Sequence, residues 1–193
     1  MGVYMVSLGA EDWFGTGEDG WAEVASALDA ELVRRGLPPY EDVPPATRFV
    51  RGSGLTFEEK LARPMHGFTA LGEGRLTPEE WETLCGWSVL VPVSLDEEIR
   101  MPVESTDFDS MIAGAPQVRA IAEKLAEAVA LPPEVPATCD NLDLSTWFDR
   151  HAATLAGTRP GPWSEDLDAA FYVALFLRAA QHSIRRGCPM ICR

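Results

Sequence analysis

The chain is poor in basic residues. Its 193 residues include 16 Lys and Arg against 30 Asp and Glu, which gives a formal net charge of −14. A protein that follows a nucleic-acid backbone needs a cationic face, so we expect no nucleic-acid partner. A surplus of carboxylates instead attracts basic partners and speeds their encounter. The charge therefore favours a function in which the protein binds a basic protein.

Long apolar segments are also missing. The longest uninterrupted one, 169–177, is far shorter than the roughly 20 residues of a membrane-spanning helix. The first residues carry no basic segment followed by an apolar one, and Glu11 and Asp12 arrive early, unlike in a secretory or mitochondrial leader. We expect a cytoplasmic protein without a membrane partner. The scarcity of Lys beside Arg, with many Ala, Gly and Pro, is typical of a GC-rich bacterial genome.

Local motifs for metals, phosphates and nucleophiles are absent as well. The histidines form no HxH or HExxH pair, and no C-x-x-C, P-loop or G-x-S-x-G pattern occurs. In a chain of this kind we expect reduced, mostly buried thiols and no cofactor or metal. The catalytic residues, if any, stay open. The four cysteines are Cys85, Cys139, Cys188 and Cys192.

Asp107 and Asp109 are a pair of carboxylates whose spacing could suit a cation. In an extended chain both would face the same side and could share a divalent ion. Aspartates in turns also bond to their own backbone, and no further ligand follows at a fixed spacing. We favour the turn and leave the metal site as the alternative.

The apolar pattern predicts the fold class. With 46% hydrophobic residues the chain can form one domain over residues 1–193 with a substantial core. Strands and helices do not alternate regularly, so a doubly wound parallel sheet is disfavoured. We predict an α+β fold: a small, mostly antiparallel sheet with about five or six helices packed against it and a long buried C-terminal helix.

Individual elements follow from periodicity, caps and breakers. Short apolar segments predict strands at 3–8, 47–51, 87–95 and 99–103, the last two forming a hairpin. Pro92 and Pro102 each remove a donor from the sheet, so at least one of these two strands should lie at an edge. Helices are predicted at 20–35, from Thr56 to before Pro64, 77–86, 116–130, 145–155 and 164–186. Capping boxes at Thr56–Glu59 and Thr77–Glu80 begin two of them, and Ser145 and Ser164 cap the last two.

Two acidic segments, 11–19 and 40–42, carry the leading functional hypothesis. Both contain aromatic residues outside the predicted helices and strands, where we expect them to be exposed. Exposed aromatics beside carboxylates are typical of a protein-binding face. The sequence therefore predicts a non-enzymatic binding or inhibitor-type protein that captures a basic partner. The predicted partner-binding residues are Asp12, Trp13, Phe14, Glu18, Asp19, Tyr40, Glu41 and Asp42.

The end of the last helix supports an alternative. Four basic or titratable residues there fall on one helix face, and no acidic residue follows Asp168. They could form an anion or ligand pocket of a small-molecule-binding protein or enzyme. Cations at a helix C-terminus are also ordinary, because they interact favourably with the helix dipole. The residues of this alternative site are Arg178, His182, Arg185 and Arg186.

Overall fold

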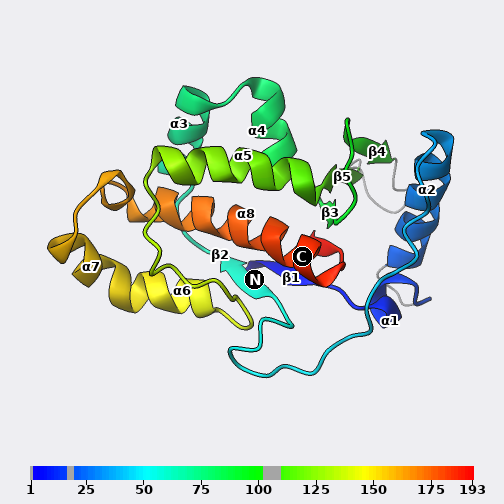
Figure 1. Cartoon of the computed structure of the whole chain (residues 1–193), viewed down its shortest axis with the longest axis horizontal. Helices are drawn as coiled ribbons and strands as arrows, with labels where there is room; N and C mark the ends of the chain where they lie inside the picture. Colours follow the sequence, from blue (N-terminus) through cyan, green and yellow to red (C-terminus); the bar gives the residue numbers. More distant parts are fainter. Residues whose placement is uncertain (1, 17–19, 102–109) are drawn as a thin grey trace.

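A computed structural model describes residues 2–16, 20–101 and 110–193 and confirms the α+β class (Figure 1). Over these residues the chain forms one mixed sheet in the order β2-β1-β6-β3-β5-β4. Neighbouring strands are antiparallel except β3 and β5, which are parallel. The strands are β1 (Val3–Ser7), β2 (Glu58–Leu61), β3 (Val89–Val91), β4 (Ile99–Met101), β5 (Ser110–Gly114) and β6 (Met190–Cys192).

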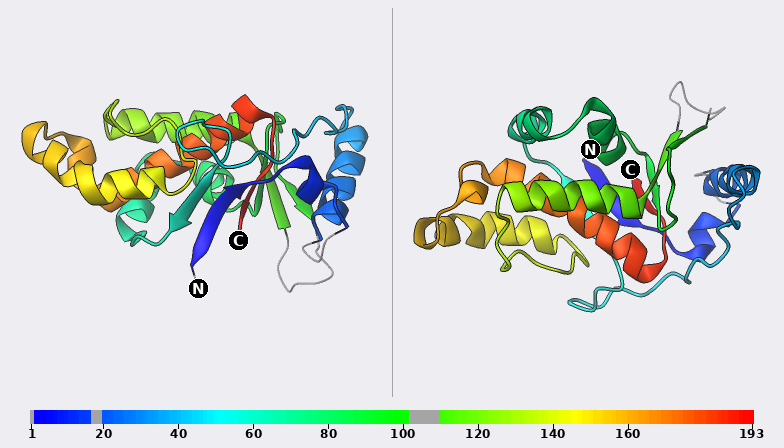
Figure 2. Two further views of the ribbon diagram at one scale, coloured as in Figure 1. Left: turned by 90° about the horizontal axis from the view of Figure 1, so that it is seen from below. Right: turned by 45° about the horizontal axis from the view of Figure 1, so that its top comes forward.

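Several helices pack against a long buried helix near the C-terminus, α8, as the sequence predicts. In Figure 2 α5 lies along α8, and α2 lies on the other side of the sheet. The α-helices are α1 (Ala10–Trp13), α2 (Trp21–Arg34), α3 (His66–Arg75), α4 (Pro78–Cys85), α5 (Ala115–Ala128), α6 (Asp143–Trp147), α7 (Ala153–Thr158) and α8 (Leu167–Arg186). A π-helical turn, Phe148–Ala152, joins α6 to α7, and a 3-10 turn, Pro162–Ser164, precedes α8. None of the described helices is long and apolar enough to cross a bilayer.

The core has two parts, one on each face of the sheet. Alternate residues of a strand point to opposite faces, and in β3 the side chain of Leu90 joins the core under α5 and α8, whereas Val89 and Val91 join the core under α2. The final strand does the same, with Met190 on the first face and Ile191 on the second. The sheet is therefore covered on both faces.

Residues 47–61 fold differently from the prediction. Residues 47–51 form no strand, and the expected helix after Thr56 is wrong because Glu58–Leu61 form β2. β2 pairs antiparallel with β1, with Tyr4 opposite Lys60. The Thr56 hydroxyl donates to the Asp140 carbonyl oxygen at 3.1 Å rather than capping a helix. Pairing with a distant strand thus overrides a local capping signal.

The predicted hairpin is also wrong. β5 lies between β3 and β4: Val89 is opposite Ile112 in the parallel pair, and β4 pairs with the other side of β5. β4 lies at the sheet edge, as expected for one of these two strands. Besides β2, two further strands were not predicted: β5, and β6, which joins β1 to β3.

Helices with strong local signals are confirmed, while two further predicted caps, besides the one at Thr56, are not. The helices at 20–35, 77–86 and 116–130 match α2, α4 and α5 within a few residues, and Thr77 and Glu80 form the predicted capping box. Helix α6 begins at Asp143, so Ser145 lies in its first turn. Asp166, not Ser164, caps α8, because its carboxylate accepts from the amides of Asp168 and Ala169.

Candidate functional site

The two largest aromatic residues of the predicted partner-binding face are buried. Trp13 is 0% exposed and Tyr40 is 7% exposed, so the prediction that they are available to a partner is wrong. Their ring centroids are 6.3 Å apart, and the Tyr40 hydroxyl donates to the Gly187 carbonyl oxygen at 2.8 Å. The short helix α1 turns Trp13 into the core under α2. Trp13 and Tyr40 therefore serve packing within the protein. Of the three aromatic residues predicted to be exposed, only Phe14 is accessible, with 41% of its surface exposed.

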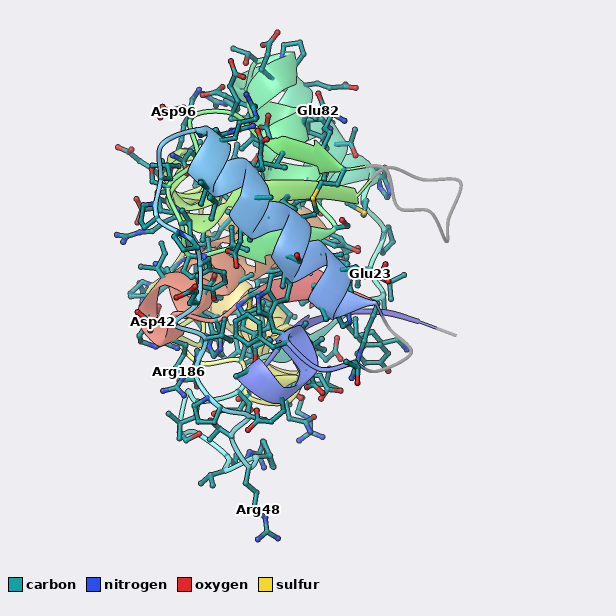
Figure 3. All side chains as sticks on the ribbon, turned by 90° about the vertical axis from the view of Figure 1, so that its right-hand side faces the viewer. Glu23, Asp42, Arg48, Glu82, Asp96 and Arg186 are labelled. Atoms are coloured by element: carbon teal, nitrogen blue, oxygen red, sulfur yellow. The ribbon has the colours of Figure 1, made fainter. Side chains whose placement is uncertain are left out.

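The acidic residues of the same face are accessible. Asp12, Glu41 and Asp42 are exposed, and within the described part of the chain none of them forms an ion pair. Glu18 and Asp19 lie outside the described residues. Figure 3 shows Glu23, Asp42, Glu82 and Asp96 around α2, with Arg48 at the far end of the molecule. The surplus charge at Asp12, Glu41 and Asp42 is therefore not cancelled by ion pairs.

The four residues of the alternative site do not converge on one pocket. The Arg178 guanidinium donates to the carbonyl oxygens of Pro136 at 2.7 Å and Val135 at 3.2 Å, which ties α8 to the preceding connector. His182 is 2% exposed and its ring lies against Phe57, with centroids 5.5 Å apart. Neither residue lines any of the three cavities described below. Arg178 and His182 therefore make contacts within the protein, and the joint site predicted for them is not seen among these cavities.

The other two arginines of that set contact the loop between Thr47 and Gly54. Nη2 of Arg185 donates to the Gly54 carbonyl oxygen at 3.3 Å, and Nη2 of Arg186 donates to Thr47 Oγ1 at 3.4 Å. Burial first, and then the charges of Arg185 and Arg186, lower the pKa of His182 to about 4. Of the four residues only Arg186 lines a cavity described here.

A different cavity combines an apolar lining with a carboxylate rim. It encloses about 320 Å³ between α4, the 95–98 segment and the first half of α5, and its lining is mostly apolar. Leu95 and Ile121 are buried and half-buried, respectively. The four carboxylates around it belong to Glu79, Glu80, Asp96 and Glu98. We call this site the α4–α5 pocket; none of its residues is among those predicted from the sequence.

Two of the four carboxylates are occupied by internal partners. Glu80 accepts from the Thr77 amide at 2.9 Å and from Lys124 Nζ at 3.0 Å, and these contacts, the amide first, lower its pKa. Glu98 accepts a hydrogen bond from the Thr83 hydroxyl. These two carboxylates are positioned by the fold and are only partly available to a ligand.

The other two carboxylates are available. Glu79 and Asp96 are exposed and form no ion pair with another described residue. Hydrogen bonds from its own backbone amide and from the Thr77 hydroxyl lower the pKa of Glu79, so this side chain stays ionised at neutral pH. The pocket therefore offers apolar contact and unpaired negative charge at one place.

No metal centre is formed by the described residues: in them, no three His, Cys, Asp or Glu side chains are grouped to hold an ion. The four cysteines are free. Asp107 and Asp109, the carboxylate pair of the sequence hypothesis, lie outside the residues that the structure describes.

Comparisons with protein-family models, curated proteins and solved structures found no match to this chain. The α4–α5 pocket and the acidic surface are the features of the described structure that bear on function. The sequence contains both acidic runs of the pocket, 79–80 and 96–98, but they are separated by a strand. Only the parallel pairing of β3 with β5, which sets the start of α5 beside the 95–98 segment, brings them together.

Proposed function

We propose that this protein binds a basic protein partner and that the α4–α5 pocket receives a Lys or Arg side chain of that partner. Such a side chain has an apolar stem and a cationic end. Ala120 and Ile121 offer apolar surface to the stem, and the unpaired carboxylates of Glu79 and Asp96 offer charge to the end. This match between the lining of the pocket and the chemistry of one side chain is the observation that carries the proposal.

The acidic surface outside the pocket serves the encounter. A net charge of −14 attracts a cationic protein from a distance. Asp12, Glu41 and Asp42 are exposed and unpaired in the described structure, so their charge reaches the solvent. Charges of this kind raise the association rate more than the final affinity, and added salt screens them. Affinity and specificity then come mainly from the pocket.

The experiment compares two doubly substituted proteins in binding to decalysine, measured by calorimetry at low ionic strength. Glu79→Gln with Asp96→Asn removes the two unpaired carboxylates of the pocket. Glu73→Gln with Glu165→Gln makes the same change in net charge at exposed, unpaired carboxylates that do not line the pocket.

We expect the pocket variant to bind decalysine roughly threefold or more weakly than the control variant. The two variants carry equal net charge, so a difference between them reports the pocket and not the overall field. Equal affinities of the two variants would contradict the pocket as the anchor. An affinity that does not fall between 20 and 300 mM salt would contradict the electrostatic attraction itself.

A further inference from the structure

A second site, separate from the α4–α5 pocket, lies at the end of β1. Two adjoining cavities of about 200 Å³ each share Ser7, Leu8, Asp12, Thr47 and Thr56 in their walls. They lie where β1 ends, beside α1 and the last turn of α8, and residues of the loop 47–56 line both. We call the two together the β1 cleft.

In the first cavity of the β1 cleft, the one acidic and the one basic side chain of the lining form no ion pair with another described residue. Asp12 and Arg186 both line the first cavity. Within the described structure Asp12 accepts no hydrogen bond and forms no ion pair, and Arg186 donates a single bond, to Thr47 Oγ1 at 3.4 Å. A guanidinium carries five N–H donors, so most of those of Arg186 are free. The two charges share a cavity without neutralising each other.

The wall that carries Thr56 is held in place by a buried carboxylate. Asp140 is 2% exposed and accepts from the amides of Gly54 at 3.0 Å and Thr56 at 3.3 Å. Burial alone would raise the pKa of Asp140. The hydrogen bonds from these two amides and from the hydroxyls of Ser53 and Thr56 outweigh burial and lower the pKa, so the group stays ionised. The buried carboxylate of Asp140 thus holds the loop 47–56 in place at Gly54 and Thr56.

A second wall depends on a close approach of two backbone segments. A Cβ on Gly9 would lie 2.4 Å from the Ala46 nitrogen and 2.5 Å from its Cα. The Ala46 amide also donates to Glu11 Oε2 at 2.6 Å. Segment 44–46 is therefore held against the start of α1, and both line the first cavity. Both walls are built before any ligand arrives, which lowers the cost of binding.

We infer that the β1 cleft binds a small zwitterion of the free α-amino-acid class. The Arg186 guanidinium has the fork of donors that suits a carboxylate, and the Asp12 carboxylate suits an ammonium group. Hydroxyls of Ser7, Thr47 and Thr56 add neutral polar partners, and Leu8 and Leu55 add apolar surface for a side chain. A ligand with only one charge would leave either Asp12 or Arg186 unpaired in the cleft.

The test begins with the free proteinogenic L-α-amino acids, each titrated into the full chain by calorimetry and by the change in melting temperature. The amino acid with the largest effect is then compared with its N-acetyl form, which lacks the ammonium, and its amide, which lacks the carboxylate. We expect saturable binding of the free amino acid and about tenfold or greater weakening for each blocked form.

Variants assign the two charges to their residues. We expect Arg186→Gln and Asp12→Asn each to weaken binding of the free amino acid by about tenfold. Arg48→Gln and Glu165→Gln remove the same charges at exposed residues outside the cleft and should bind as the wild type does. Circular dichroism and thermal unfolding check that all four variants fold.

Three results would overturn the inference: no saturable binding of any free amino acid, blocked forms that bind as tightly as the free one, or Arg186→Gln and Asp12→Asn proteins that bind like their controls. The β1 cleft shares no lining residue with the α4–α5 pocket. A failure here is therefore distinguishable from a failure of decalysine binding.

Discussion

The carboxylate of Glu59 accepts three hydrogen bonds at the start of α6, and two of them come from Ser145. The Ser145 hydroxyl donates at 2.7 Å and its amide at 3.1 Å, and the Leu144 amide donates at 2.6 Å. Glu59 belongs to β2 and is 0% exposed. A strand residue thus satisfies amides that a helix start leaves without partners and joins the sheet to the α6–α7 arm.

Glu59→Gln should destabilise the protein by about 1–3 kcal/mol, because the amide nitrogen of glutamine cannot accept from Ser145 or Leu144. Burial outweighs the three donors and raises the pKa of Glu59 above 4.5. Folding then favours the protonated form of Glu59. The stability that this preference contributes is fully present below pH 4.5 and is lost as the pH rises through the pKa of the folded state. In urea unfolding, the stability gap between wild type and variant should narrow from pH 4.5 to pH 7. A gap that widens would show that the ionised form is the one the fold favours.

Gly9→Ala should cost about 1–3 kcal/mol, because the new methyl group meets backbone atoms of Ala46 that cannot rotate away. Gly74→Ala is the matched control. Gly74 lies within α3 with open space around it, so alanine there should stabilise by about 0.5–1 kcal/mol. Denaturant midpoints measure both. Equal effects of the two substitutions would contradict the close crossing of segment 44–46 over the start of α1.

His182 should make the protein sensitive to acid. Its pKa is lowered to about 4 by burial and by Arg185 and Arg186, which together outweigh Asp140. Unfolding exposes a histidine that titrates near 6.5, so the unfolded state binds the extra proton and stability falls as the pH drops from 6.5 toward 4. Between pH 7 and 4.5 the wild type should lose roughly 2 kcal/mol more than His182→Leu. Parallel losses in the two proteins would show that His182 does not carry this sensitivity.

The thiols should be slow to react in the folded protein. Burial raises the pKa of Cys85 and Cys188 to about 12 and that of Cys192 to about 11, so few thiolates exist at pH 8. Ellman's reagent should label the native chain far more slowly than the chain in urea. Fast labelling of the native protein at the unfolded rate would contradict the burial of these side chains.

Elements with complete local signals could be predicted from the sequence, and elements that depend on distant partners could not. The capping box at Thr77 and the amphipathic pattern of 116–130 lie within single helices, and both were confirmed. β6 is three residues long and is ordered by β1 and β3, more than ninety positions away in the chain. Its sequence, Met-Ile-Cys, has too few residues to show a strand period.

Thr56 and Glu59 illustrate how a correct chemical signal can be assigned to the wrong element. Their spacing suits a capping box, and Glu59 does cap a helix, but the helix is α6 and not the one predicted to follow Thr56. The residue pattern shows which groups a side chain can bond. It does not show which amides the fold places next to it.

The candidate site was only partly predictable for the same reason. Exposure of Asp12, Phe14, Glu41 and Asp42 follows from local composition and agrees with the structure. The burial of aromatic residues in the same segments depends on α2 and the sheet, which no local pattern reveals. The α4–α5 pocket likewise exists only once β3 and β5 have paired.

The most direct test of the central claim is an NMR titration with two matched peptides, Ac-Gly-Gly-Lys-Gly-Gly-NH2 and the same peptide with norleucine in place of lysine. Norleucine keeps the stem and lacks the ammonium. We predict that the lysine peptide shifts the amide signals of Leu95, Asp96 and Ile121 in a saturable manner, and that the norleucine peptide does so much more weakly. Equal shifts with both peptides, or none at these residues with lysine, would contradict the α4–α5 pocket as a site for a basic side chain.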